Sequence, residues 1–220
     1  QADCPMAHMA QVAQIQKLRA EVPDLAVVCY INSSAELKAH SDVCVTSSNA
    51  VKVVSALPQK NILFIPDKNL GSFVAKQLPG RNFYYSGGYC PVHAVLLAED
   101  VLAEKRAHPA AEVLVHPECT EEVVKAADFA GSTAEIIAHA EAGAAREFIL
   151  GTEPGVLHEL ERRCPGKKFY PVTPVCRDMK RITPEKVLAC LTGGGYEVKM
   201  GAELMDAARA PLARMLELAN

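Results

Sequence analysis

The chain repeats itself at an interval of 86 residues. Cys4, Cys90 and Cys176 are spaced by that interval, and the residues around them follow in the same register without a gap. One segment of the first copy recurs in the second, with Pro79, Gly80, Phe83 and Tyr84 matching Pro165, Gly166, Phe169 and Tyr170. Solenoid units have roughly 20 to 50 residues, so a repeat this long is better interpreted as a small domain. We therefore predict homologous domains that each present one thiol.

Each copy alternates apolar runs of strand length with helical patterns. In the first copy we expect strands over 26–31, 43–45, 62–65 and 82–85, and helices from Ser34, from Ser48 and over 70–78. This alternation favours a parallel sheet with helices on both faces. The predicted fold class is α/β, with a pseudo-threefold arrangement of homologous three-layer αβα domains around a central site. Residues 5–90 and 91–176 would form one repeat each.

The net charge and amino-acid composition limit the kinds of partner that we expect the protein to bind. The net charge is −3, half of the residues are hydrophobic, and the chain has no Trp. Neither a basic stripe for phosphates nor an aromatic platform for bases is visible, so we expect no nucleic-acid partner. No apolar run approaches the roughly 20 residues that cross a bilayer, so we expect no membrane partner and a cytoplasmic location.

The chain has eight cysteines, which could form a disulfide framework. Several of them instead lie in apolar strand-like or helical runs, as buried thiols do, for example Cys29, Cys44 and Cys190. A reducing compartment fits this pattern better. Cys119 and Cys164, like these three, lack the full 86-residue register, and we interpret all five as ordinary thiols.

Polar residues follow the first predicted strand of each copy, and they differ between the copies. Tyr30 and Asn32 end this strand in the first copy, whereas His116 and Glu118 stand at the same place in the second. Ligands of open parallel sheets bind beyond the carboxyl ends of the strands, so all four are site candidates. The alternatives are a strand-end tyrosine with a surface hydroxyl and a solvated His–Glu pair.

Hydroxyl groups follow the second predicted strand of each copy. They are Thr46 and Ser47 in the first copy and Ser132 and Thr133 in the second, each before a predicted helix. A hydroxyl there can cap the helix, and the free N–H groups of the first turn can hold an anion. We predict two anion-binding corners that face one centre.

The three repeat-spaced cysteines are predicted to converge near the pseudo-symmetry axis. Three thiolates on a 4Fe-4S cluster leave one iron with an open position, which can polarise the oxygen groups of a substrate. A lone intracellular cysteine is more often a buried apolar residue. The shared register reverses that expectation for Cys4, Cys90 and Cys176.

Several separated motifs resemble those of the quinolinate synthase family, in the family's order and over essentially the whole chain. They are Cys4-Pro5-Met6-Ala7, Tyr30-Ile31-Asn32-Ser33, Thr46-Ser47-Ser48-Asn49-Ala50, Gly88-Tyr89-Cys90 with His93, His116-Pro117-Glu118-Cys119, Gly131-Ser132-Thr133 and Cys176-Arg177-Asp178-Met179-Lys180. The resemblance implies a transferase-type enzyme of NAD biosynthesis that uses a 4Fe-4S cluster. It would condense iminoaspartate with dihydroxyacetone phosphate to give quinolinate, phosphate and two waters.

The resemblance also implies roles for individual residues. Cys4, Cys90 and Cys176 resemble the cluster ligands, and His116 and Glu118 the acid–base pair. Tyr30 and Asn32 resemble groups that position substrate, and His93 resembles a further histidine of the cavity. Ser47, Ser132 and Thr133 resemble groups that hold carboxylate or phosphate. L-aspartate oxidase or aspartate dehydrogenase would supply the iminoaspartate.

The sequence departs from the family pattern at its start. Family members carry a first repeat before the cysteine matched by Cys4, with a His-x-Tyr motif and another anion-binding serine. We expect residues 1–4 to be the end of such a repeat and 177–220 to complete it, so that the chain is a fragment or a second polypeptide supplies the rest. Cys176 is followed by Arg177, Asp178 and Met179 rather than by a Cys-x-x-Cys motif.

Two other functions remain open at this stage. The first is a hydro-lyase that uses the same cluster chemistry on a different small polyacid and needs no triose phosphate. The second is a non-catalytic repeat scaffold that binds zinc through the three thiolates.

Overall fold

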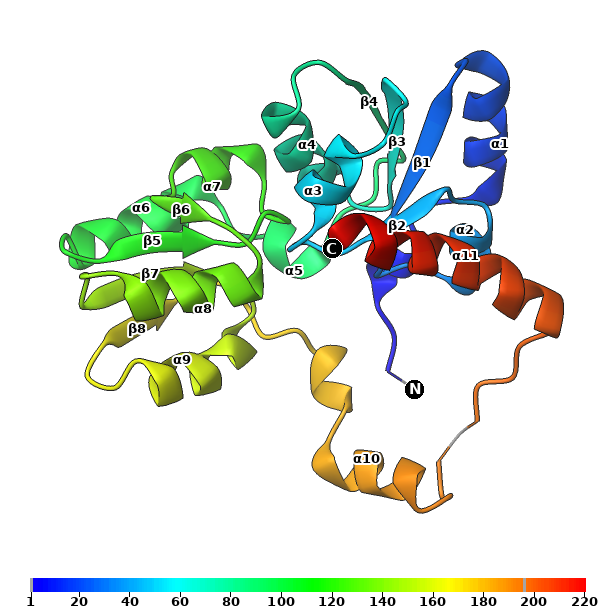
Figure 1. The fold of residues 1–220 in the computed structure, drawn as a ribbon. Helices are drawn as coiled ribbons and strands as arrows, with labels where there is room; N and C mark the ends of the chain where they lie inside the picture. The colour runs from blue at the N-terminus through cyan, green and yellow to red at the C-terminus, as the bar shows by residue number, and fades with distance from the viewer. Residues whose placement is uncertain (1, 196) are drawn as a thin grey trace.

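The computed structural model describes residues 2–195 and 197–220. Its centre consists of two similar units that lie side by side (Figure 1). We call residues 5–90 the first repeat and 91–176 the second repeat. No helix in the described part of the chain is long and apolar enough to cross a membrane.

The first repeat is built on a parallel four-stranded sheet of order β2-β1-β3-β4. Its strands are β1 (Leu25–Tyr30), β2 (Val43–Val45), β3 (Asn61–Ile65) and β4 (Asn82–Tyr85). The helical elements are η1 (Pro5–His8), α1 (Val12–Glu21), α2 (Ala35–Ala39), α3 (Ala50–Ser55) and α4 (Lys68–Gln77). The expected strands are confirmed to within a residue, whereas the helix expected from Ser48 begins at Ala50.

The second repeat has the same topology, with a parallel sheet of order β6-β5-β7-β8. Its strands are β5 (Glu112–Val115), β6 (Phe129–Ala130), β7 (Glu147–Gly151) and β8 (Lys168–Pro171). Its helical elements are α5 (Pro91–Ala94), α6 (Ala98–Ala107), α7 (Glu121–Lys125), α8 (Thr133–Ala142), η2 (Pro154–Val156) and α9 (Leu157–Arg163). Strands β7 and β8 lie 86 residues after β3 and β4, so the register inferred from the sequence is also a structural one.

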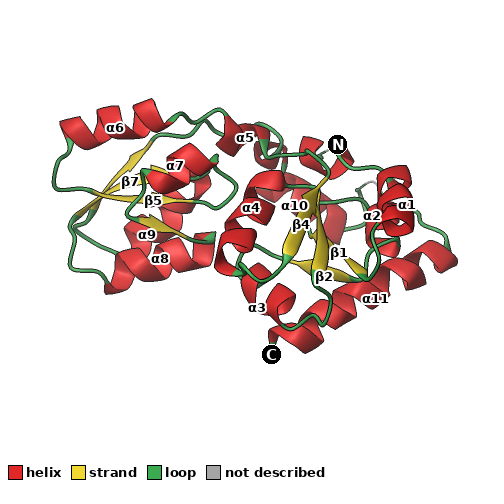
Figure 2. Ribbon diagram, turned by 90° about the horizontal axis from the view of Figure 1, so that it is seen from above, coloured by secondary structure: helices red, strands yellow, loops and turns green. Residues whose placement is uncertain are grey.

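Side chains of the second sheet alternate between its two faces, and each face packs against its own layer of helices. Val113 and Val115 pack with α6 and α7 on one face, whereas Leu114 packs with α8 and α9 on the other. Figure 2 shows both sheets enclosed between helices. Successive side chains of a strand point to opposite faces, so the nearly all-apolar runs of β1, β3 and β5 require two covered faces. The predicted three-layer αβα class is confirmed.

Local sequence signals place the helix starts. The Ser34 hydroxyl accepts a hydrogen bond from the Leu37 N–H at the start of α2. The Ser132 hydroxyl accepts one from the Glu135 N–H at the start of α8. Such caps satisfy N–H groups that the helix leaves without partners. In α4, a Cβ on Gly71 would approach the Phe64 ring to 3.0 Å, so glycine allows this helix to lie close against the first sheet.

The C-terminal segment leaves the second repeat and returns to the first (Figure 1). Its helical elements are η3 (Met179–Arg181), α10 (Pro184–Leu191) and α11 (Ala202–Ala219). Helix α11 packs against α2, α3 and the edge strand β2, and buries Met215 in the core of the first repeat. Helix α10 stands apart from both sheets and buries none of its residues.

The C-terminal segment, residues 177–220, bears on two expectations from the sequence. Cys190 was expected to be a buried thiol, but it is exposed on α10, a helix that buries none of its residues. The expectation that 177–220 completes a further domain stays a prediction.

Candidate active site

A cavity of about 440 Å³ lies where the two repeats and the C-terminal segment meet. All three repeat-spaced cysteines line it, and each is partly exposed. The other lining residues that the sequence singled out are Tyr30, Asn32, Ser47, His93, His116, Glu118 and Thr133. Of the predicted residues, Thr46 and Ser132 do not line the cavity.

A larger hollow of about 700 Å³ lies between α4 and α7. Its lining contains none of the repeat-spaced cysteines and neither His93 nor Glu118. Size alone would favour this hollow, but convergent titratable and thiol groups indicate chemistry more directly. We therefore assign the candidate active site to the 440 Å³ cavity.

The cysteines enter the cavity from equivalent places in the fold. Cys4 directly precedes η1, and Cys90 directly precedes α5. The carbonyl oxygen of Cys176 accepts a hydrogen bond from the Lys180 N–H, which closes a comparable turn. None of the three forms a disulfide, so three thiols are available to one cavity.

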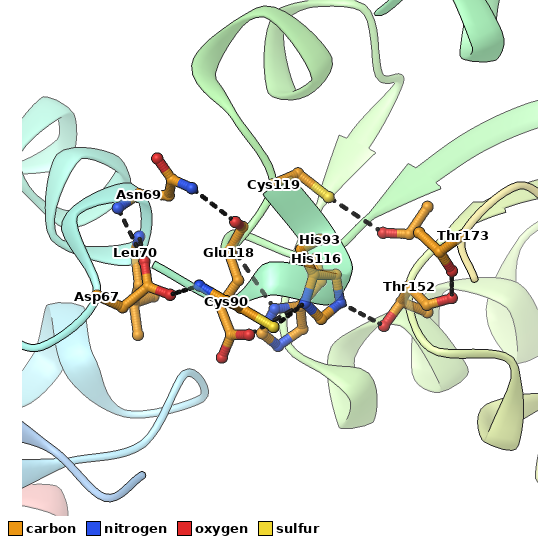
Figure 3. Close-up of polar contacts among 11 residues, drawn as sticks. Asp67, Asn69, Leu70, Cys90, His93, His116, Glu118, Cys119, Thr152 and Thr173 are labelled. Carbon is orange, nitrogen blue, oxygen red and sulfur yellow. Dashed lines mark hydrogen bonds and ion pairs between the residues drawn. The ribbon is translucent and has the colours of Figure 1, made fainter. Parts of the chain in front are cut away.

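Glu118 and His93 form the buried polar centre of the cavity. The Glu118 Oε2 lies 3.0 Å from the His93 Nδ1, and both side chains are more than nine-tenths buried. The same Nδ1 lies 3.2 Å from the Cys90 Sγ, and the His93 Nε2 lies 3.4 Å from the Thr152 Oγ1. Figure 3 shows this group at the junction between the repeats. A carboxylate, an imidazole and a thiol are thus in direct contact.

The environment of Glu118 favours its ionised form. Burial opposes ionisation, but hydrogen bonding to His93, the nearby His116 and the Tyr30 hydroxyl together lower the Glu118 pKa to about 2. Burial and the Glu118 charge in turn raise the pKa of Tyr30 well above its usual range. The pair therefore places a hydroxyl that keeps its proton beside a carboxylate that lacks one, as acid–base chemistry requires.

His116 is held by backbone contacts and ring stacking. Its Nδ1 accepts a hydrogen bond from the Glu118 N–H at 3.2 Å, which leaves the other ring nitrogen to carry the proton of a neutral imidazole. Its ring stacks on that of His93 with centroids 4.8 Å apart. Burial lowers the His116 pKa to about 4, so the ring is neutral near pH 7.

The hydroxyl groups at the second strands differ between the repeats. Ser132 is buried and caps α8 in a capping box with Glu135, and Thr133, the first residue of that helix, lines the cavity. In the first repeat neither predicted hydroxyl caps α3: its N-cap residue is Asn49, whose Oδ1 accepts from the preceding Thr46 N–H and makes no cap bond to the helix. Ser47 does not cap the helix; it lines the cavity and acts to lower the pKa of Tyr30.

Sequence reasoning missed three polar residues in or beside the cavity. Thr152 and Glu153 line it, and Asp67 is fully buried directly after β3. Asp67 and Glu153 are 86 residues apart, so the 86-residue repeat could have identified them as an equivalent pair of carboxylates. Burial and the Glu118 charge raise the Asp67 pKa to about 7.

The donor set suits a metal centre. Three free cysteines lie in one cavity, and ligand atoms of Cys90, His93 and Glu118 lie within 4.8 Å of one another. Thiolates are the protein ligands of iron–sulfur clusters, and zinc also binds cysteine and histidine. The residues present therefore fit either kind of centre.

Comparisons with known proteins identify the relatives of this chain. The profile of the family "Quinolinate synthetase A protein" matches residues 1–217. A quinolinate synthase of Fusobacterium nucleatum is 48% identical over 220 residues, which are 100% of this chain and 74% of that protein. One from Caldicellulosiruptor saccharolyticus is 48% identical over 99% of this chain and 72% of its own length. One from Clostridioides difficile is 43% identical over 100% of this chain and 73% of its own length.

Proposed function

The chain belongs to the quinolinate synthase family, whose members are enzymes of NAD biosynthesis, and from that premise we propose the reaction and the roles of its residues. The proposed reaction condenses iminoaspartate with dihydroxyacetone phosphate and releases quinolinate, phosphate and two waters. An enzyme that oxidises aspartate, such as L-aspartate oxidase or aspartate dehydrogenase, would supply the iminoaspartate. We propose a reducing, cytoplasmic setting.

One observation carries this proposal. Three cysteines at equal sequence spacing share a cavity with a buried carboxylate–imidazole pair. Cys4, Cys90 and Cys176 would hold a 4Fe-4S cluster. When bound, such a cluster supplies an iron with an open position, which acts as a Lewis acid on substrate oxygen atoms.

The protein groups supply the proton transfers that ring formation requires. Glu118 is ionised and can accept a proton from a carbon beside a carbonyl or imine, which leaves a neutral carboxyl group, and His93 at 3.0 Å can take that proton on from it. His116 is neutral and can donate a hydrogen bond from its remaining ring N–H to a departing hydroxyl. The Tyr30 phenol keeps its proton and can donate a hydrogen bond to a substrate oxygen.

The remaining polar groups are proposed to bind substrate. Asn32 and Ser47 line the first-repeat side of the cavity, and Thr133 lines the second-repeat side. Ser132 contributes indirectly, because its cap begins the helix that presents Thr133. The N-terminal N–H groups of the ten-residue α8 favour an anion, so a substrate carboxylate or phosphate would bind beside Thr133.

The first test is an iron and sulfide count on protein prepared without oxygen. We expect about four irons per chain, with most of them lost in Cys90→Ser and kept in Cys190→Ser. Cys190 is the matched control because it is exposed on α10, outside the cavity.

The second test is quinolinate formation with and without dihydroxyacetone phosphate. Product that depends on the triose phosphate supports the proposal, whereas turnover of a polyacid alone would indicate the hydro-lyase. Zinc in place of iron, with no turnover, would indicate the metal-binding scaffold and reject the proposed reaction.

A further inference from the structure

Two buried carboxylates occupy the same place in the two repeats. Asp67 follows β3 and Glu153 follows β7, and their exposed fractions are 0% and 8%. Each begins a helical segment. Asp67 Oδ1 accepts from the Asn69 and Leu70 N–H groups, and Glu153 Oε2 accepts from the Gly155 N–H.

The second oxygen of each carboxylate binds the backbone of a repeat-spaced cysteine. Asp67 Oδ2 accepts from the Cys90 N–H at 3.1 Å, and Glu153 Oε1 accepts from the Cys176 N–H at 3.2 Å. In both repeats the carboxylate precedes its cysteine by 23 residues. Figure 3 shows the bond from Asp67 to Cys90. The same bond is made although glutamate is one methylene longer than aspartate.

Capping alone does not account for this arrangement. A cap needs one acceptor oxygen, and serine or asparagine supplies it without burying a charge. Here one carboxylate bridges a helix start and a cysteine loop. In the first repeat the loop also approaches closely, because the Lys68 N–H donates to the Gly88 carbonyl and a Cβ on Gly88 would lie 2.5 Å from the Pro66 oxygen.

The two bridges differ in their charge environment. Lys180 lies 3.2 Å from the Glu153 Oε1, so that bridge includes an ion pair with a residue four positions after Cys176. Asp67 has no ion pair within residues 2–195 and 197–220, and its two oxygens accept from three backbone N–H groups. Both arrangements fix a cysteine backbone at the edge of the cavity.

We propose that Asp67 and Glu153 are positioning residues that hold the backbones of Cys90 and Cys176 in place for metal binding. The cluster role rests on the proposed function, whereas the backbone role does not. Loss of one bridge should loosen its own cysteine loop and leave the other loop unchanged.

The matched controls are Asp42 and Asp128, a second pair of carboxylates 86 residues apart. Asp42 Oδ2 accepts from the Val27 N–H and Asp128 Oδ2 from the Val113 N–H. Neither lines the cavity. Asp42→Asn and Asp128→Asn therefore remove a carboxylate that binds a backbone N–H far from the cysteines.

The experiment measures amide hydrogen exchange of the two cysteine loops in metal-free protein, and the rate of iron loss to a chelator in loaded protein. We expect Asp67→Asn to speed exchange at Cys90 at least tenfold with Cys176 unchanged, and Glu153→Gln to do the reverse. Both should lose iron at least tenfold faster than the two control variants. Asp67→Ser, which keeps a cap oxygen but is too short to reach Cys90, should behave like Asp67→Asn if the bridge matters more than the cap.

The outcomes distinguish the positioning role of the two carboxylates from the proposed function of the chain. Unchanged exchange at Cys90 and Cys176 in folded Asp67→Asn, Asp67→Ser and Glu153→Gln would overturn the positioning role. Iron loss at the control rate would overturn its link to the cluster. A wild-type chain that takes up no iron would reject the proposed function, and the exchange data would then decide the backbone role alone.

Discussion

The two repeats share a scaffold but differ in the chemistry at the end of the first strand. Equivalent strands and helices fall 86 residues apart, and even the buried carboxylates Asp67 and Glu153 make equivalent bonds. After β1, however, the first repeat presents Tyr30 and Asn32, whereas after β5 the second presents His116 and Glu118. The carboxylates that bind the cysteine backbones are thus retained, and the polar groups at the end of the first strand are not.

This difference indicates a division of labour between the repeats. The second repeat contributes the carboxylate and both imidazoles, which are the groups proposed for acid–base chemistry. The first contributes a phenol, an amide and Ser47, which can bind and orient. Duplicated domains allow this, because the packed sheets fix both strand ends while the residue at each end is free to change.

The substitution Glu118→Gln is the strongest test of the different roles proposed for the two repeats. Glutamine keeps the shape of the side chain but cannot exchange a proton, so we expect the rate of quinolinate formation to fall by about 10²- to 10⁴-fold. Iron content should stay at the wild-type level. Glu112→Gln, on strand β5 just before Glu118 but outside the cavity, is the matched control.

A Glu118→Gln rate within tenfold of wild type would contradict the division of labour. Asn32→Asp, added to Glu118→Gln, tests the same point. A new carboxylate at the end of the equivalent strand should not restore the rate that the loss of the Glu118 carboxylate removed.

The sequence predicted the scaffold well because its signals are local or repeated. Strands β4, β7 and β8 followed from apolar runs and the 86-residue register, and Ser132 followed from its capping pattern. The contacts between the repeats did not follow. The Asn69 Nδ2 donates to the Glu118 carbonyl across 49 residues, and no periodicity specifies such a pair.

The missed site residues show the same limit. Asp67 resembles an ordinary helix cap in sequence, and only the fold brings Cys90 to its second oxygen. Cys190 was misjudged for a related reason. Its helix has an apolar pattern, but burial depends on whether another element packs there, and none of the described elements covers it.

Core substitutions test whether the shared scaffold behaves as two separate units. Phe64 on β3 and Phe148 on β7 are both fully buried, in the cores of the first and the second repeat. Truncation of a buried phenylalanine to alanine costs about 3–5 kcal/mol, so Phe64→Ala and Phe148→Ala should each lower the free energy of unfolding by that amount. Chemical denaturation with hydrogen exchange gives both the amount and its location.

We expect each variant to lose exchange protection in its own repeat only, with Leu102→Ala, an exposed residue of α6, as the control. Loss of protection in both repeats after either substitution would show one cooperative unit. The repeats would then be equivalent in fold but not independent in stability.

Helix α11 covers the edge of one repeat only. It packs on β2, whose three residues are fully buried, whereas the equivalent strand β6 is only half-buried. Met215→Ala removes a side chain that is 8% exposed, so we expect a loss of about 2 kcal/mol in the first repeat and none in the second. The neighbouring Leu216→Ala, at 62% exposed, should change little. Equal losses of exchange protection in both repeats would mean that α11 stabilises the whole chain.

Tyr30→Phe gives the smallest expected effect and tests the first-repeat side of the division of labour. The substitution removes only the hydroxyl that interacts with Glu118, and polar interactions with charged groups contribute about 1.5–3 kcal/mol. His93 still partners the carboxylate, so we expect the lower end, or about a tenfold fall in the rate of quinolinate formation. Tyr85→Phe, on the exposed edge strand β4, is the control. A fall as large as that of Glu118→Gln would make Tyr30 an equal partner in proton transfer, because a residue that only orients substrate leaves the proton acceptor intact.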